Sequence, residues 1–320
     1  MVKILSKIKI YLTKYKIGKL IILFYHYIIS VPLLWMLSLK YLLIKKSIVK
    51  PFFYENNYVF NELKYNKKSL SRFGDGEISW IFGESKGSFN QKNSKLLSER
   101  LKEVIESKNE GIFIAIPHFF ESDLKHYSLK RRISRNAHLA SSHKKWEKII
   151  DKERKYADAL ITRIYLGLKN TDSKKLFASW KSVWEDKNIV IVEGEQTRFG
   201  IGNDLLDNAK SVKRIIAPSE NAFSKYHSIL ETTKRHSSKD TLFLISLGPT
   251  ASILAYDLAV LGYQAIDIGH LDIEYEWFIK KAKKKISIKG KYVNEAGGSS
   301  NEELSSDLIK EYRFEIVEKI

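Results

Sequence analysis

The chain has 320 residues, of which 44% are hydrophobic and 12% aromatic, so it is long and apolar enough to fold around a sizeable core. It contains no cysteine, which excludes disulfides, thiolate metal sites and a cysteine nucleophile. The net charge is +18, and residues 1–50 contribute ten lysines and no acidic residue. The other 270 residues carry 45 basic and 37 acidic side chains, a net charge of +8. This distribution favours an anionic membrane surface over nucleic acid as a partner.

The first 50 residues are predicted to associate with a membrane. A run of 20 residues from Leu20 to Leu39 contains no Asp, Glu, Lys or Arg, which is about the length of a helix that spans a bilayer. Lysines flank this run on both sides, so the positive-inside rule gives no orientation. A single span and a helix that lies in, or re-enters from, the cytoplasmic leaflet remain equal alternatives.

A short motif at the start of the soluble part places two carboxylates on either side of a glycine. Residues 51–68 are predicted to be a linker, and residues 69–73 a short strand that ends at the motif DGE. If this segment is extended, Asp75 and Glu77 point the same way, and both can bind one Mg²⁺ or Mn²⁺. A surface turn is the alternative interpretation, because Gly-Asp-Gly is also ordinary turn sequence.

Apolar strands, loops and helices alternate between residues 111 and 268. This alternation predicts an α/β fold with a Rossmann-like parallel sheet and helices on both faces. We expect one domain over residues 69–295 and a C-terminal helix over residues 296–320. A further helix is expected just after Asp204. The predicted strands cover residues 111–117, 159–166, 188–194, 212–218, 241–247 and 263–268.

Polar and glycine-rich loops follow most of these predicted strands. In a parallel sheet, ligands bind beyond the carboxyl ends of the strands, and glycine loops that open helices offer backbone amides to phosphate. The sequence has no GxGxxG or GxxxxGK[ST] pattern, so neither a standard dinucleotide site nor a P-loop is indicated. The candidate phosphate- or nucleotide-binding residues are Arg72, Gly74, Arg198, Asn203, Ser219, Asn221, Gly248, Pro249 and Thr250.

The chain resembles the GT-D-fold glycosyltransferases in several motifs, which occur in the same order over roughly residues 65–295: RFGDGE, VEGEQTRFGIGNDLLDNAK, IIAPSENAF, LGPTASILAYDLAVLGYQAIDIGHLDIEYEW and GKYVNE. The resemblance implies a Rossmann-like domain that transfers a sugar, of the hexose type, from a UDP-sugar donor. It also implies that Asp75 and Glu77 form a DxE motif for a divalent metal, typically Mn²⁺, and that His270 and Glu276 contribute to activity. Residues 1–50 fall outside the resemblance.

The implied acceptor is a hydroxyl of a glycan, glycoprotein or lipid-linked molecule. If the reaction inverts the anomeric configuration, His270 or Glu276 takes the acceptor's proton. A structural hydrogen bond is the alternative role for His270, and an acidic helix start is the alternative for Glu276. We expect the domain at the cytoplasmic face of the cell membrane, with the membrane surface bound through residues 1–50 and no nucleic-acid partner.

Two other functional classes stay open at this stage. A metal-dependent phosphohydrolase could use the same carboxylates and phosphate loops, and would hydrolyse a UDP-sugar whether or not an acceptor is added. A nucleic-acid-binding protein would use the basic soluble domain and would show a steep dependence of affinity on salt.

Overall fold

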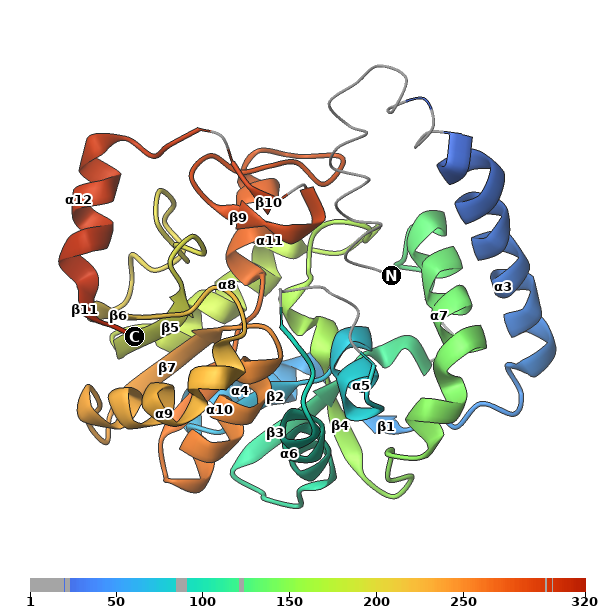
Figure 1. The fold of residues 1–320 in the computed structure, drawn as a ribbon, viewed down its shortest axis with the longest axis horizontal. Helices are drawn as coiled ribbons and strands as arrows, with labels where there is room; N and C mark the ends of the chain where they lie inside the picture. The colour runs from blue at the N-terminus through green and yellow to red at the C-terminus, as the bar shows by residue number, and fades with distance from the viewer. Residues whose placement is uncertain (1–19, 21–23, 85–90, 121–123, 297, 301) are drawn as a thin grey trace. The chain divides into compact units, whose positions relative to one another are not determined.

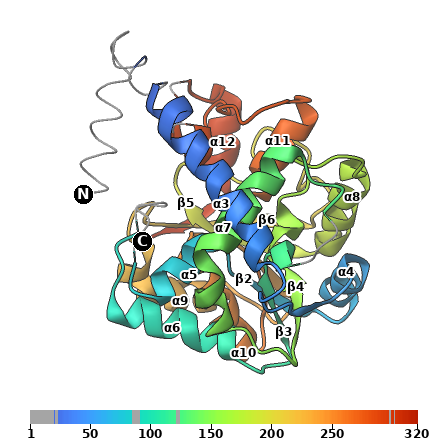
Figure 2. The same ribbon diagram turned by 90° about the vertical axis from the view of Figure 1, so that its right-hand side faces the viewer.

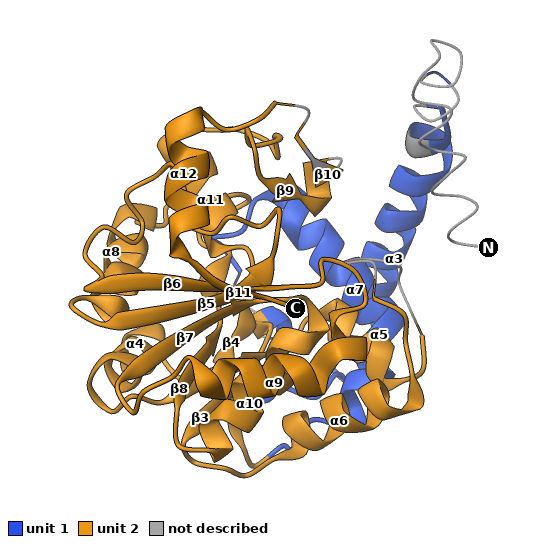
Figure 3. Ribbon diagram, turned by 60° about the vertical axis from the view of Figure 1, so that its left-hand side comes forward, with its two compact units in different colours: residues 1–51, 119–152 blue, residues 52–118, 153–320 orange. Residues whose placement is uncertain are grey.

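A computed structural model of the chain describes residues 20, 24–84, 91–120, 124–296, 298–300 and 302–320 (Figure 1). It divides into two compact units, which Figure 3 colours separately. The helical unit consists of Met1–Pro51 and Phe119–Lys152, and the sheet unit consists of Phe52–His118 and Glu153–Ile320. The domain predicted over residues 69–295 is thus divided between the two units, because residues 119–152 contain a long helix that packs against the N-terminal helix.

The helical unit is built on two helices that lie side by side, α3 (Val31–Ile44) and α7 (Leu129–Glu147) (Figure 2). A π-helical turn, His26–Ser30, leads into α3, and Tyr27–Ile44 is long and apolar enough to cross a membrane by length and composition. The hydroxyl of Ser128 caps α7 by accepting the amide of Arg131.

The sheet unit contains a nine-stranded sheet in which every pairing is parallel, so the predicted fold class is confirmed. The strand order is β1-β4-β3-β2-β8-β7-β5-β6-β11. The strands are β1 (Phe52–Phe53), β2 (Ser69–Arg72), β3 (Ile112–Ile116), β4 (Lys155–Asp158), β5 (Asn188–Gly194), β6 (Ser211–Ala217), β7 (Thr241–Ser246), β8 (Gln264–Asp267) and β11 (Ile316–Lys319). A two-stranded antiparallel ribbon joins β9 (Tyr292–Val293) to β10 (Gly298–Ser299).

Helices cover both faces of this sheet, which is why its central strands are apolar on both sides. In β5, Ile189 and Ile191 belong to one core and Val190 and Val192 to the other. Helices α4, α8 and α11 contribute to the first core, and α9 and α10 to the second. The helices of this unit are α4 (Asn56–Tyr65), α5 (Asp75–Ile81), α6 (Lys95–Glu106), α8 (Ser173–Trp184), α9 (Tyr226–Arg235), α10 (Pro249–Val260), α11 (Leu271–Ile279) and α12 (Ser306–Glu315).

The predicted linker and the predicted C-terminal helix both differ from the structure. Residues 51–68 contain β1 and α4, and α4 buries Val59, Phe60 and Leu63 in the core because they lie on one side of the helix. The C-terminus continues beyond α12 as strand β11, which pairs with β6. This strand is an edge strand, so its sequence lacks the apolar run that identifies a central strand.

Two predictions inside the domain are also wrong. The strand predicted at residues 159–166 lies earlier, at β4, and a 3₁₀ turn (Ala159–Thr162) follows it. That turn forms because the carboxylate of Asp158 accepts the amide of Leu160 at 2.9 Å. The helix expected after Asp204 is replaced by turns.

Candidate functional site

A polar pocket of about 780 Å³ lies at the carboxyl ends of the parallel strands of the sheet unit. This volume is within the range of sites that bind drug-sized or cofactor-sized ligands. Residues that follow β2, β3, β4, β5, β6, β7 and β8 all contribute to its wall. The wall includes Arg72, Gly74, Asp75, Glu77, Pro117, Ala159, Arg163, Gly194, Pro218, Ser219, Ser246, Gly248, Asp267, His270, Asp272, Tyr292, Asn294 and Glu295.

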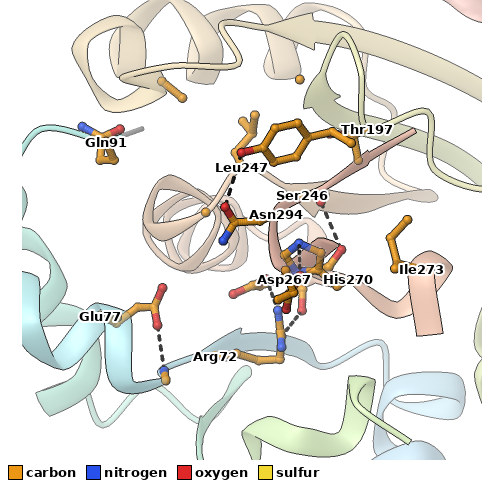
Figure 4. A pocket seen from close by; sticks show the side chains of 18 of the residues that line it. Arg72, Glu77, Gln91, Thr197, Ser246, Leu247, Asp267, His270, Ile273 and Asn294 are labelled. Carbon is orange, nitrogen blue, oxygen red and sulfur yellow. Dashed lines mark hydrogen bonds and ion pairs between the residues drawn. The ribbon is translucent and has the colours of Figure 1, made fainter. Parts of the chain in front are cut away.

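The two carboxylates of the DGE motif both line this pocket, but not through an extended segment. Asp75 is the first residue of α5, and Glu77 stands in its first turn. Successive helical residues turn by about 100°, so positions i and i+2 do not face each other. The Glu77 carboxylate turns back to accept the amide of the N-cap residue Gly74 at 2.8 Å (Figure 4). The predicted extended geometry is therefore wrong, although both residues reach the same pocket.

Glu77 is half-buried beside other carboxylates, and the loss of hydration raises its pKa to about 7. Burial is the largest cause, and the charges of Asp267 and Asp75 raise it further, against the opposing effect of the backbone hydrogen bonds. The two carboxylates of the DGE motif fit a divalent cation, because Mg²⁺ or Mn²⁺ usually takes only one or two protein carboxylates and completes its coordination with phosphate oxygens and water. In the described ranges, no group of three or more His, Cys, Asp or Glu side chains is placed to hold a metal ion.

Arg72 lies at the floor of the pocket and binds neighbouring groups of the chain (Figure 4). Its guanidinium donates to the Asp267 carbonyl at 2.7 Å, the Asp267 carboxylate at 2.8 Å and the Thr162 hydroxyl at 2.7 Å. A side chain on Gly269 would meet Arg72 Nη2 at 1.9 Å, so this position requires glycine. Arg72 thus ties together the ends of β2, β4 and β8, and its predicted phosphate contact stays a prediction.

His270 lies beside Arg72 and Asp267 in the pocket wall, next to Arg163 (Figure 4). Arg163 Nη2 lies 3.1 Å from His270 Nδ1, and because a guanidinium can only donate, Nδ1 is the acceptor. Burial and the positive charge of Arg163 lower the pKa of His270 to about 3. The imidazole is therefore neutral and carries its proton on Nε2. It can donate a hydrogen bond from Nε2, but its basic nitrogen is already engaged, so the predicted role as a proton acceptor does not fit.

Glu276 is held away from the pocket by a buried ion cluster. Lys291 Nζ contacts the Asp272 carboxylate at 2.7 Å and the Glu276 carboxylate at 3.3 Å. The amide of Asn203 donates to both carboxylates at 2.8 Å. Burial raises the pKa of Glu276, but Lys291, Asn203 and Lys280 together outweigh this effect and lower the pKa. Glu276 is not among the residues that line the pocket. Glu276 and Asn203 are therefore structural residues here, and neither the predicted base nor the predicted nucleotide contact is supported.

The remaining predicted binding residues divide into two groups. Ser219 and Gly248 line the pocket, and Gly248 has φ +54°, a conformation that favours glycine. Asn221, Pro249, Thr250 and Arg198 do not line it. The Asn221 side chain accepts the amide of Lys92, and the Arg198 guanidinium donates to the carbonyl of Gly290.

A segment that we call the strap, residues 280–296, supplies wall residues that sequence reasoning missed. Tyr292, Asn294 and Glu295 line the pocket, and Arg163 Nη2 binds the Glu295 carboxylate at 2.8 Å. The strap is anchored by Lys291, by the apolar side chains Ile288 and Val293, and by a bond from the Tyr292 amide to the Gln196 carbonyl at 2.8 Å. The motif GKYVNE contains these wall residues, but the sequence alone did not show which residues Lys291 binds.

Comparison with known proteins agrees with this architecture. A family model described as glycosyltransferase GT-D fold matches residues 70–296. A probable glycosyl transferase Gly of Streptococcus gordonii is 41% identical over 229 residues, which are 71% of this chain and 33% of that protein. The glycosyltransferase GlyD of Streptococcus pneumoniae is 32% identical over 256 residues, or 80% of this chain and 31% of that protein. The chain thus spans about a third of the length of these curated relatives.

Solved structures match over most of the chain. One, described as a new glycosyltransferase from Streptococcus sanguinis, superposes with a TM-score of 0.77 and 35% identity over 84% of this chain and 99% of that one. Another, described as a highly conserved domain of unknown function with a distinct glycosyltransferase fold, has a TM-score of 0.77 and 32% identity. It covers 91% of this chain and 99% of that one, so the shared fold reaches into residues 1–50, beyond the sequence motifs. The chain belongs to the GT-D-fold glycosyltransferase family.

Proposed function

We propose that the chain transfers a sugar from a UDP-sugar donor to a hydroxyl group of an acceptor, and that this reaction depends on a divalent cation. The carrying observation is the pocket itself, in which Asp75 and Glu77 stand on one wall while glycine turns after β7 and β8 open helices. A neutral sugar alone would not need these carboxylates. A diphosphate donor brings further negative charge, and a cation held between the two would offset both.

The donor diphosphate is proposed to lie at the amino end of α10. Gly248 is the N-cap of this 12-residue helix and lines the pocket. The positive end of the helix dipole and the amides of its first turn favour an anion at this position. No side-chain hydrogen bond caps the helix, which leaves its end available to a ligand.

Asp75 and Glu77 are the residues that would hold the cation, which would supply charge neutralisation at the leaving diphosphate. Glu77 must lose its proton to do so, and its raised pKa means that cation and proton compete for this carboxylate near neutral pH. His270 is proposed to donate a hydrogen bond from Nε2 to the donor or to the acceptor. Arg163 fixes this tautomer, because it occupies Nδ1.

The test is release of UDP from a panel of UDP-sugars, measured with Mn²⁺, with Mg²⁺ and with EDTA, together with sugar transfer to added acceptors. We expect turnover with a divalent cation and loss of turnover in EDTA. Asp75→Asn should lower the rate by roughly ten- to several-hundred-fold without unfolding the protein. Asp240→Asn is the matched control, because Asp240 is exposed and pairs only with surface Lys67 among the ion pairs of the described chain.

Two results would contradict the proposal. Full activity in EDTA would show that the reaction needs no divalent cation. A wild-type rate in the folded Asp75→Asn protein would show that the DGE carboxylates take no part in the reaction. UDP-sugar hydrolysis that no acceptor redirects would instead identify a phosphohydrolase.

A further inference from the structure

Helix α3 exposes apolar side chains around most of its circumference, and its two most buried side chains are polar, unlike those of an ordinary surface helix. The side that packs against α7 includes two polar side chains, Ser38 and Tyr41, which are only 8% and 9% exposed. The Asn136 amide donates to the Ser38 hydroxyl at 3.1 Å, and the Arg135 guanidinium lies 4.6 Å from the centre of the Tyr41 ring. A surface helix of a soluble protein normally places such residues outward and its apolar stripe inward.

The outward face of α3 is strongly apolar. Met36, Leu39 and Leu43 follow one another at helical spacing and are 59%, 61% and 86% exposed. The same face continues toward the N-terminus with Tyr25, Ile28 and Ile29, which are also exposed. A contiguous apolar surface of this kind marks a contact with lipid or with another protein.

The charges near the outward face of α3 favour a lipid surface as its binding partner. Lys40, Lys45 and Lys46 are exposed on or just after α3, and the first 50 residues contain no acidic side chain. Apolar side chains with lysines at their margin are the composition of helices that bind the interface of an anionic bilayer, since each lysine near such a surface adds about 1 kcal/mol of attraction.

The charges of the neighbouring helix α7 indicate whether α3 lies in the membrane surface or crosses the bilayer. It runs along α3 in the same unit, and it exposes Lys130, Arg132 and Lys144. If α3 crossed the bilayer while packed in this way, the charges of α7 would enter the hydrocarbon region, where each costs several kcal/mol. If α3 lies in the surface instead, its outward face enters the lipid while α7 stays on the aqueous side.

We propose that α3 binds an anionic membrane surface as an in-plane helix that does not cross the bilayer. Its outward face supplies the buried apolar area, and the exposed lysines contact the lipid headgroups. This proposal is independent of the sugar-transfer reaction, because its readouts require no enzymatic turnover.

The binding test uses the full chain and vesicles of phosphatidylcholine with or without phosphatidylglycerol. We expect sedimentation with the phosphatidylglycerol vesicles and weaker binding at high salt. The double substitution Leu39→Glu, Leu43→Glu should lower the vesicle affinity by about tenfold or more. Leu96→Glu is the matched control, because Leu96 on α6 is 60% exposed, as Leu39 is 61% exposed.

Several outcomes of this experiment would overturn the proposal. One is unchanged vesicle binding by the double variant with a normal melting curve. Another is a wild-type chain that does not bind the anionic vesicles. A third is a dimer that the double variant dissociates, which would assign the outward face to a second copy of the chain.

A labelling experiment distinguishes an in-plane helix from a span. The chain has no cysteine, so Lys19→Cys and Ser47→Cys introduce single thiols on either side of the apolar run. We expect a membrane-impermeant maleimide to label neither thiol in intact cells and both thiols after lysis. Labelling of one thiol from outside intact cells would establish a span and refute the in-plane helix.

Discussion

Glu77 is half-buried, and it lines a pocket that already contains the carboxylates of Asp75 and Asp267. The Gly74 amide compensates one of its oxygens, but burial still makes the charged form costly, and the pKa rises to about 7. A group whose pKa is higher in the folded than in the unfolded state binds its proton more tightly when folded. Glu77 therefore favours folding at low pH, and this contribution is lost as the pH rises from about 4.5 to about 7.

Replacement of Glu77 by glutamine should stabilise the protein at alkaline pH. The amide oxygen of Gln can still accept the Gly74 amide, but the charge is gone. We expect Glu77→Gln to melt at least about 5 °C higher than the wild type at pH values well above 7, corresponding to roughly 2–3 kcal/mol, and the difference to shrink toward pH 4.5. Thermal melts over this pH range, without added metal, measure the effect. A variant that is less stable than wild type at alkaline pH would show that the carboxylate is compensated by groups other than the Gly74 amide.

The same variant should no longer respond to a divalent cation. In the wild type, Mn²⁺ should raise the melting temperature more at alkaline than at acidic pH, because deprotonated Glu77 is the ligand. We expect this pH-dependent response to disappear in Glu77→Gln, while the exposed control Glu185→Gln retains it. An equal Mn²⁺ response in both variants would place the cation elsewhere.

His270 should act as a hydrogen-bond donor, and this can be separated from a role as a base. Glutamine can place an N–H close to the position of His Nε2, whereas alanine cannot. We expect His270→Ala to lower kcat/KM by about a hundredfold and His270→Gln to retain most of the activity. The wild-type rate should show no imidazole titration between about pH 6 and pH 8. Equal loss of activity in the two variants, with an inflection of the wild-type rate near the ordinary pKa of histidine, would indicate that His270 acts as a base.

At the scale of elements, the strap depends on one buried lysine. Lys291 is the only cation of the described residues that contacts both Asp272 and Glu276, and its side chain is 1% exposed. Through these contacts it joins the strap to α11 beside the pocket residues Tyr292, Asn294 and Glu295. The ion cluster thus converts an irregular segment into a fixed part of the wall.

Lys291→Met should therefore destabilise the protein and loosen the strap. Removal of one partner leaves buried carboxylates uncompensated, which costs about 3–5 kcal/mol. We expect a lower melting temperature and faster proteolysis between residues 280 and 296, with partial recovery of stability when Asp272→Asn is added, because the two changes share one cluster. Lys289→Met, at an exposed position two residues earlier, is the control. Additive losses in the double variant would show that Lys291 does not act through Asp272.

At the scale of the whole molecule, the last residues complete the sheet. Strand β11 pairs with β6, and Val317 and Ile320 pack against one of the two cores. Removal of residues 316–320 would expose the edge of β6 and these apolar contacts. We expect the truncated chain to melt at a lower temperature and to aggregate more readily than the wild type. Lys319→Ala, which removes only an exposed pair with Glu195, should behave like the wild type. Unchanged stability on truncation would mean that β11 contributes no net pairing energy.

The sequence by itself determined the parallel sheet and the edge at which ligands bind. Strands β3, β5 and β7 are continuous apolar runs, because a strand covered on both faces has no polar side to display. Since strand direction then fixes where the loops emerge, the DGE turn, the loops after β5 to β8 and His270 could be assigned to one site without a structure.

Only the tertiary structure decided what each polar residue of that site does. Arg72, Asn203 and Glu276 are residue types that often bind ligands or act in catalysis. In the folded chain they bind Asp267, Asp272 and Lys291, and these partners lie far away in the sequence or on other elements. The exposed apolar surface of α3 became visible in the same way, because an apolar run indicates burial without showing which neighbour buries it. Side-chain type and spacing are local properties of a chain, whereas the partner of a charge or of an apolar face is set by long-range packing.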